Sequence, residues 1–187
     1  MILGEGTKDW LNESEAGELR GLLNGWLGFG HMMPKRIHRA YWTHEFLMRV
    51  SVTDIRWILV VSGIEALVNT KSTGNKKQFV DRGFYLANKF NIALSRDNLE
   101  NAYDVRSELV HAENFLVALD NFVPVVHQNV LCEKFEWLLR ITLKTCFLDE
   151  TFGEIFNDPR QSRRACDDGP VDIYRRSGSL TSSRSPR

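Results

Sequence analysis

The chain has 187 residues, of which 43% are apolar and 26% are charged, and its 24 Lys and Arg balance its 24 Asp and Glu. This composition is ordinary for a globular protein and excludes a wholly disordered or fibrous chain. The net charge of zero excludes the global basic field typical of duplex-DNA-binding domains, so a nucleic-acid role would have to rest on a local site.

The cysteines and the apolar windows bear on the compartment. Cys132, Cys146 and Cys166 are widely spaced, form no CxxC motif and follow no secretory hydrophobic region, which predicts a reducing, cytoplasmic environment. We expect the first two to be small buried residues. The most apolar window, 57–68, contains Glu65 and is too short to cross a bilayer, so we expect no membrane partner.

The first half of the chain predicts three helices after a loose start over residues 1–9. Apolar residues recur at helical spacing over about 10–27 and again over about 35–50, where Pro34 suits the first turn. A third helix is expected over about 54–69, and it is apolar on nearly every side. Such a helix belongs in the middle of a bundle.

The second half of the chain predicts three more helices. They are expected over about 76–90, over about 96–112, where Ser95 can serve as the N-cap, and over about 125–148, which Pro124 opens. No stretch alternates strictly enough to predict a strand. The expected fold class is therefore all-α, a helical bundle.

The composition changes near residue 157. From there to the end the chain has seven Arg against four Asp, three of its five prolines and many serines. Such a segment cannot bury enough apolar surface to offset the cost of ordering, so we expect a disordered tail. A basic Arg/Ser tail can touch RNA, although a solvated terminus is the favoured interpretation. The chain is thus divided into an N-terminal segment with one helix (1–34), a helical domain (35–156) and the tail (157–187).

One arginine in the helix predicted over 96–112 lies in an unusual place. On a helical wheel Arg106 falls in the middle of an apolar face that comprises Leu99, Ala102, Tyr103, Leu109 and Val110. A buried arginine is costly unless its charge is answered. Either a carboxylate meets it inside the bundle, or it lines a cleft that receives an anion such as phosphate. Glu65, on the most apolar helix, is the best carboxylate candidate.

A histidine follows Arg106 on the same helix. His111 lies on the flank, on the side of Asp104 and Ser107. RNA carries its own nucleophile, the 2′-hydroxyl, so a base that removes its proton and a cation that stabilises the charged phosphorane suffice for cleavage without metal. Histidine is the natural base near neutral pH, and arginine binds phosphate oxygens as a fork. The expected products carry a 2′,3′-cyclic phosphate and a 5′-hydroxyl.

Several segments between residues 35 and 150 match one family pattern in order and spacing. They are Arg36-Ile37-His38-Arg39-Ala40, then Asp54-Ile55-Arg56-Trp57-Ile58-Leu59 with Gly63-Ile64-Glu65-Ala66-Leu67, then Phe79-Val80-Asp81-Arg82, and finally Tyr103-Asp104-Val105-Arg106-Ser107 ahead of Val110-His111. Together they resemble the Apea-like branch of HEPN domains, small all-α modules with an Arg-x4-6-His signature that cleave RNA or bind nucleotides. The family often has glycine after the histidine, where this chain has Ala112.

The resemblance implies a metal-independent endoribonuclease without a cofactor, of the toxin or phage-defence kind. It assigns Arg106 to the scissile phosphate and His111 to the base or acid. Ser107 and Arg82 become candidate substrate-binding residues, and the supporting candidates are Glu65, Asp104 and Tyr103. HEPN modules commonly form homodimers in which both copies of the motif line one cleft. The expected partners are therefore a second copy, RNA, and a cognate antitoxin or larger assembly.

Other interpretations of the same residues stay open. Arg106 and Glu65 can form a purely structural ion pair, and Arg82, on an expected exposed turn, can be a surface or structural residue. The alternative function is a catalytically inactive HEPN module that binds RNA or nucleotide or serves in dimerisation. Because the resemblance begins only near residue 35, the chain can also be a shortened relative of longer proteins.

Two further histidine patterns occur in the sequence. Arg39 and His44 repeat the spacing of the motif in a context that matches the family less well. His38 and His44, six residues apart, do not show metal-ligand spacing, so we expect no metal site.

Overall fold

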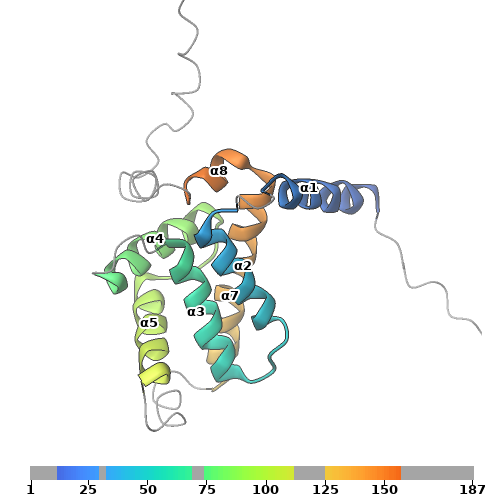
Figure 1. The fold of residues 1–187 in the computed structure, drawn as a ribbon. Coiled ribbons are helices and arrows are strands. Elements are labelled where there is room, and N and C mark those ends of the chain that lie inside the picture. The colour runs from blue at the N-terminus through green and yellow to red at the C-terminus, as the bar shows by residue number, and fades with distance from the viewer. Residues whose placement is uncertain (1–11, 30–32, 69–73, 112–124, 157–187) are drawn as a thin grey trace, which may run out of the picture.

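The computed structural model describes most of the chain outside its two ends and three internal segments, namely residues 12–29, 33–68, 74–111 and 125–156, without the side chains of 111 and 125–128. The described residues form an all-α bundle and contain no strand (Figure 1). Its helices are α1 (Glu13–Phe29), α2 (Lys35–Leu47), α3 (Thr53–Val68), α4 (Asn75–Lys89), α5 (Arg96–His111), α7 (Val125–Leu148) and α8 (Glu150–Glu154). The predicted fold class is confirmed.

The helix ends follow local capping chemistry. Ser95 Oγ accepts a hydrogen bond from the backbone N–H of Asn98 at 3.1 Å, and Asn98 Oδ1 accepts one from the N–H of Ser95 at 3.0 Å. This reciprocal pair starts α5 where the sequence predicted. The short helix α8 was not predicted; Asp149 caps it by accepting a hydrogen bond from the N–H of Phe152 at 3.0 Å. The expected loose start and disordered tail lie outside the described residues.

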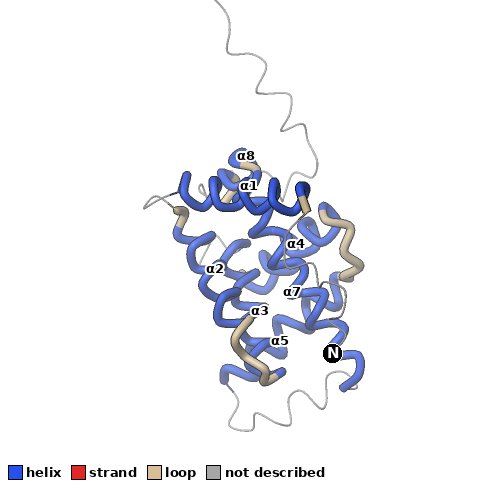
Figure 2. Tube along the Cα trace, turned by 90° about the vertical axis from the view of Figure 1, so that its right-hand side faces the viewer, coloured by secondary structure: helices blue, strands red, loops and turns tan. Residues whose placement is uncertain are grey.

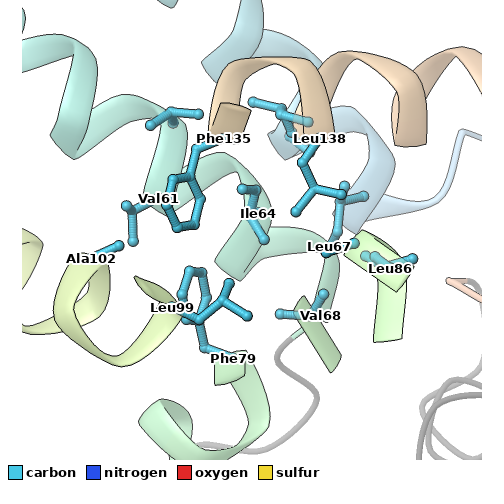
Figure 3. Packing of buried hydrophobic residues seen from close by; sticks show 14 of the residues in the cluster. Val61, Ile64, Leu67, Val68, Phe79, Leu86, Leu99, Ala102, Phe135 and Leu138 are labelled. Carbon is cyan, nitrogen blue, oxygen red and sulfur yellow. The ribbon is translucent and has the colours of Figure 1, made fainter. Parts of the chain in front are cut away.

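The most apolar helix, α3, occupies the middle of the bundle, as predicted. It packs against α2, α4, α5 and α7. Figure 3 shows Ile64 of α3 among side chains from α4, α5 and α7, including Leu99 and Phe135. The Trp57 and Phe135 ring centroids lie 5.6 Å apart. Burial of these large side chains away from water is the main force that holds the helices together.

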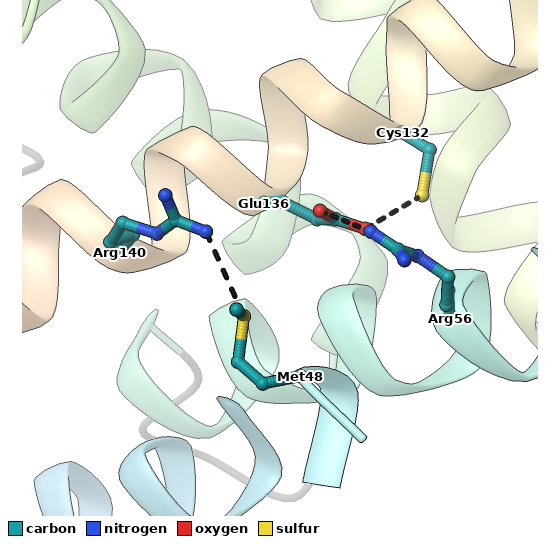
Figure 4. A network of polar contacts seen from close by, with 5 residues as sticks. All are labelled: Met48, Arg56, Cys132, Glu136 and Arg140. Atoms are coloured by element: carbon teal, nitrogen blue, oxygen red, sulfur yellow. Dashed lines mark hydrogen bonds and ion pairs between the residues drawn. The ribbon is translucent and has the colours of Figure 1, made fainter. Parts of the chain in front are cut away.

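A polar clamp joins α3 to α7 beside this core. Arg56 donates from Nε to Glu136 Oε1 at 2.9 Å and from Nη2 to both carboxylate oxygens at 2.5 and 2.6 Å (Figure 4). The Sγ of Cys132 lies 3.6 Å from the same Oε1. Burial raises the pKa of the Cys132 thiol to about 12, and Glu136 adds to the effect. Cys132 and Cys146 are both buried, as predicted.

Helices α1 and α8 lie together at one end of the bundle in both views (Figures 1 and 2). Helix α1 has no fully buried residue and is held mainly against α7. Its Trp26 ring contacts the rings of Tyr41, at a centroid distance of 4.5 Å, and Phe147, at 5.7 Å. Among the helices that the structure describes, none combines the length and the apolar character that a membrane crossing requires.

Candidate functional site: a basic cavity

A cavity of about 480 Å³ opens between the start of α2, the second half of α3, the start of α4, and α5. Its described lining has four cationic side chains and one carboxylate, which leaves an excess of three positive charges in a chain whose net charge is zero. The lining residues, here called the basic cavity, are Lys35, Arg36, Arg39, Ser62, Glu65, Ala66, Asn75 and Arg106. Such a concentration of cations favours an anionic ligand.

Arg106 reaches the cavity from α5 and meets Glu65 of α3. Its Nη2 lies 3.2 Å from Glu65 Oε2, and its Nε donates to Ser62 Oγ at 3.4 Å. The two side chains of the ion pair are 25% and 16% exposed, so the pair borders the cavity rather than being sealed in the core. A carboxylate therefore meets Arg106, and the same arginine also lines a cleft.

Two buried polar atoms in the wall of the cavity, Arg36 Nη1 and Asn75 Oδ1, have no hydrogen-bond partner among the residues that the structure describes. Burial lowers the pKa of Arg36, and the positive charge of Arg82 lowers it further. A buried donor without an acceptor is costly, so an anion that reached Arg36 would relieve that cost.

Two helices present their N-terminal turns to the same cavity. Lys35 and Arg36 begin α2, and Asn75 begins α4. The cap residues are Pro34 and Gly74, and neither supplies a side-chain acceptor to the first turn. Gly74 adopts a φ of 69°, which glycine tolerates without strain. The partial positive charge of both helix ends therefore adds to that of the four cationic side chains.

The predicted exposure of Arg82 was wrong. Its side chain is buried at 2% exposure and donates from Nη1 to the backbone carbonyl of Val68 at 2.5 Å and to Gln78 Oε1 at 3.2 Å. The guanidinium thus satisfies a carbonyl at the C-terminal end of α3, a position that favours a cation. Arg82 is not among the described residues that line the basic cavity, although its charge acts on Arg36.

The other predicted residues of α5 lie around the cavity rather than in its lining. Tyr103 packs on Phe79 with ring centroids 5.5 Å apart, and burial together with the charge and hydrogen bond of Glu65 raises its pKa. Asp104 accepts a hydrogen bond from Lys76 Nζ at 2.7 Å. Ser107 is half-buried. Tyr103 therefore supports Glu65, while Asp104 ties α5 to α4.

The structure describes the two Arg/His pairs, Arg106 with His111 and Arg39 with His44, to different extents. His111 is the last residue of α5, and its side chain lies outside the described part of the structure. Arg39 lines the basic cavity, whereas His44 is not in its described lining. Burial lowers the pKa of His44, and the positive charge of Arg140 on α7 lowers it further. His44 therefore does not join Arg39 in the described lining of the basic cavity.

Lys35 and Arg36 were not predicted as site residues, and Arg39 entered only through its spacing to His44. Their signal is present in the sequence, since Lys35, Arg36 and Arg39 surround Ile37 and Ala40, which are both fully buried. Cations at this spacing flank the buried face of α2 and can reach the neighbouring helix. Among the described residues there is no group of three or more His, Cys, Asp or Glu that could hold a metal ion.

No family model, curated protein or solved structure matches this chain. The resemblance to HEPN domains therefore stays a prediction from sequence motifs, and the basic cavity is the structural feature that bears on function.

Proposed function

We propose that the basic cavity binds a phosphodiester of single-stranded RNA and that the protein is a metal-independent endoribonuclease. The observation that carries this proposal is the convergence of Arg36, Arg39 and Arg106, with Lys35, on one cavity that has a single carboxylate in its described lining. Arginine forks match phosphate oxygens, and cations placed around a phosphate stabilise the additional charge of a phosphorane.

Arg106 is the residue best placed to hold the scissile phosphate. Its guanidinium has five N–H donors in a plane, so it can keep its contact with Glu65 and present further donors to a phosphate oxygen. Glu65 and Ser62 fix the position of the guanidinium before substrate arrives. A cation that is held in place in this way does not have to reorganise during the reaction.

In the proposed reaction His111 acts as the base. It takes the proton of the 2′-hydroxyl, the 2′-oxygen attacks phosphorus, and the bond from phosphorus to the 5′-oxygen breaks. The leaving 5′-oxygen gains a proton, from an imidazolium or from water. The products are a 2′,3′-cyclic phosphate and a 5′-hydroxyl, and no metal or redox partner is needed.

The test is an RNA cleavage assay in the presence of EDTA. We expect the wild type to release cyclic-phosphate ends from labelled single-stranded RNA, and we expect Arg106→Ala and His111→Ala each to lower the rate by at least about a hundredfold. Arg140→Ala removes an exposed arginine of α7 and serves as the matched control, with an unchanged rate. Full activity of Arg106→Ala with a folded circular-dichroism spectrum would overturn the proposal.

The ion pair between Arg106 and Glu65 favours a second candidate, a binding module without cleavage, because a structural pair needs no substrate. This candidate predicts that RNA binds with an affinity that depends on Arg106 and that the bound RNA stays intact for hours.

Two further parts of the proposal are a homodimer and a toxin role. Light scattering measures whether the protein forms a homodimer. Growth of cells after induction, compared between wild type and His111→Ala, tests the toxin role.

A further inference from the structure

A second hollow lies on the outer side of α2 and shares two lining residues with the basic cavity. It has a volume of about 600 Å³ and is here called the α2 groove. The shared residues are Lys35 and Arg39, so one ligand that spans both hollows would contact these two cations. The groove has no Asp or Glu in its described lining.

Aromatic side chains cover the floor of this groove at one-turn intervals. His38, Trp42 and Phe46 all line it, and they succeed one another every four residues, about 6 Å apart along the helix axis. Trp42 is 47% exposed and Phe46 is 57% exposed. The opposite face of α2 carries the buried residues Ile37, Ala40 and Leu47, so these rings are additional to the core rather than part of it.

The Trp42 ring is held in a fixed position despite its exposure. Its Nε1–H donates to His38 Nε2 at 2.9 Å, and the two ring centroids are 6.2 Å apart in a T-shaped arrangement. Tyr41 makes a second T-shaped contact with Trp42 at 5.7 Å and itself packs against Phe147 of α7. A rigid aromatic surface loses little side-chain entropy when a flat ligand stacks on it.

We propose that the α2 groove is a stacking subsite for unpaired RNA bases that neighbour the phosphate bound in the basic cavity. This inference rests on the proposed function, because it places the nucleotides next to the cleavage site. Exposed aromatic rings beside backbone-binding cations are the combination that single-stranded nucleic acid recognises, since every base has a face that can stack. Trp42 and Phe46 receive the bases, and Lys35 and Arg39 bind the phosphates between them.

The charge of the groove decides against a second copy of this chain as its occupant. A two-fold interface would place the same patch on both protomers. Lys35 and Arg39 of both copies would then meet in a groove without a carboxylate in its described lining, which is unfavourable. A single RNA strand supplies flat bases for the rings and negative charge for the cations at the same time.

The experiment measures the affinity of the full chain for a labelled 2′-O-methyl RNA oligomer, which lacks the nucleophile and cannot be cleaved. We expect Trp42→Leu to weaken binding by about tenfold and Phe46→Leu by about fivefold, because leucine keeps the apolar surface and removes the stacking face. Trp137→Leu is the matched control. Trp137 is 51% exposed on α7, lies outside the described groove lining, and should leave the affinity unchanged.

A second ligand separates stacking from phosphate binding. Pyrophosphate has the charges of two phosphates and no base, so its affinity should be the same for wild type and Trp42→Leu and lower for Arg106→Ala. An abasic oligomer loses both stacking contacts, so it should bind the wild type more weakly than the normal oligomer binds Trp42→Leu.

The two proposals fail in distinguishable ways. Equal RNA affinity of wild type and Trp42→Leu, with Arg106→Ala still impaired, overturns the stacking subsite and leaves the proposed function in place. Equal pyrophosphate affinity of wild type and Arg106→Ala overturns the phosphate site itself. A change of oligomeric state in Trp42→Leu, measured by light scattering, with unaltered RNA affinity overturns the subsite in favour of a contact between copies.

Discussion

Two arginine–carboxylate pairs involve the same central helix, α3, and they differ in what surrounds them. Arg56 near the start of α3 contacts both oxygens of Glu136, which is 8% exposed, through Nε and Nη2. Glu65 near the end of α3 is joined to Arg106 by a contact of 3.2 Å at the edge of the basic cavity. In the first pair both carboxylate oxygens of Glu136 are bound by Arg56, whereas the pair of Glu65 and Arg106 lies beside three more cations. The same pair chemistry thus joins two packed helices in one place and borders an open basic cavity in the other.

The largest expected contrast between the two regions is in thiol reactivity. Cys132 lies beside the Arg56–Glu136 pair, and burial raises its pKa to about 12, so at pH 8 its thiol stays protonated. A thiol introduced by Ser62→Cys would line the basic cavity near Arg106, which favours the thiolate. In a Cys166→Ser background we expect the introduced thiol to react with iodoacetamide about a thousandfold faster than Cys132.

Mass spectrometry of the labelled sites after timed quenching measures both rates. Equal rates would show that the Arg56–Glu136 region is as open as the cavity.

The raised pKa of Cys132 also makes stability depend on pH. Because the pKa of Cys132 is higher in the folded than in the unfolded chain, the protonated thiol favours the folded state. Its contribution to the free energy of unfolding is complete below about pH 9 and is lost as the pH rises toward 12.

The second contrast is in the cost of removing each arginine. Arg56→Ala leaves Glu136 nearly buried without its partner, so we expect the free energy of unfolding to fall by about 2 kcal/mol, a value lowered from that of fully buried pairs because Arg56 is 35% exposed. Arg106→Ala leaves Glu65 near water and near other cations, and should cost about 1 kcal/mol. Urea denaturation gives both values, and the reverse order would contradict this comparison.

The third contrast concerns the carboxylates. Glu65→Gln removes the one negative charge from the described lining of the cavity, so we expect pyrophosphate to bind about fivefold more tightly, a gain of about 1 kcal/mol. Glu136→Gln removes a carboxylate from the clamp beside Cys132 and should leave pyrophosphate affinity unchanged. Isothermal titration calorimetry at fixed ionic strength measures the two affinities. Weaker binding by Glu65→Gln would mean that the positioning of Arg106 by Glu65 contributes more to affinity than its negative charge takes away.

The smallest effect is expected from a third, exposed pair. Lys76 and Asp104 are 42% and 50% exposed, although their charged atoms are 2.7 Å apart. Water and salt screen such a pair, so Asp104→Asn should change the free energy of unfolding by less than about 0.5 kcal/mol. RNA cleavage should not change, because Asp104 is outside the described cavity lining. A large loss of activity in this variant would place Asp104 in the site after all.

Helix positions were predictable because local signals fix them. Apolar residues at helical spacing and the Ser95 cap placed α5 at Arg96–His111, against an expected 96–112. Apolar residues on nearly every side of α3 placed that helix at the centre. Helix α8 was not predicted because five residues are too few to show a helical period of apolar residues. The structural features that mark it are the Asp149 N-cap and the buried Phe152.

The site was only partly predictable, because its residues come from four helices. The pairing of Arg106 with Glu65 followed from the cost of burying a charge, which the helical wheel reveals. The burial of Arg82 depends on the end of α3 lying against α4, and no local pattern encodes that contact. No local pattern shows that the cations at the start of α2 line a cavity, because the cavity forms only where α2 packs beside α3. These cations are Lys35, Arg36 and Arg39.

Four cationic side chains and the N-terminal ends of α2 and α4 lie around the basic cavity. Their mutual repulsion lowers the stability of the folded protein when no anion is bound there. A ligand that binds only the folded chain adds stability in proportion to its affinity and concentration, so phosphate-bearing molecules should raise the melting temperature. The converse also holds. Under the proposed function, replacing Arg36 with a neutral residue should raise the stability of the protein measured without phosphate and lower its affinity for phosphate, a trade between stability and activity that binding sites commonly show.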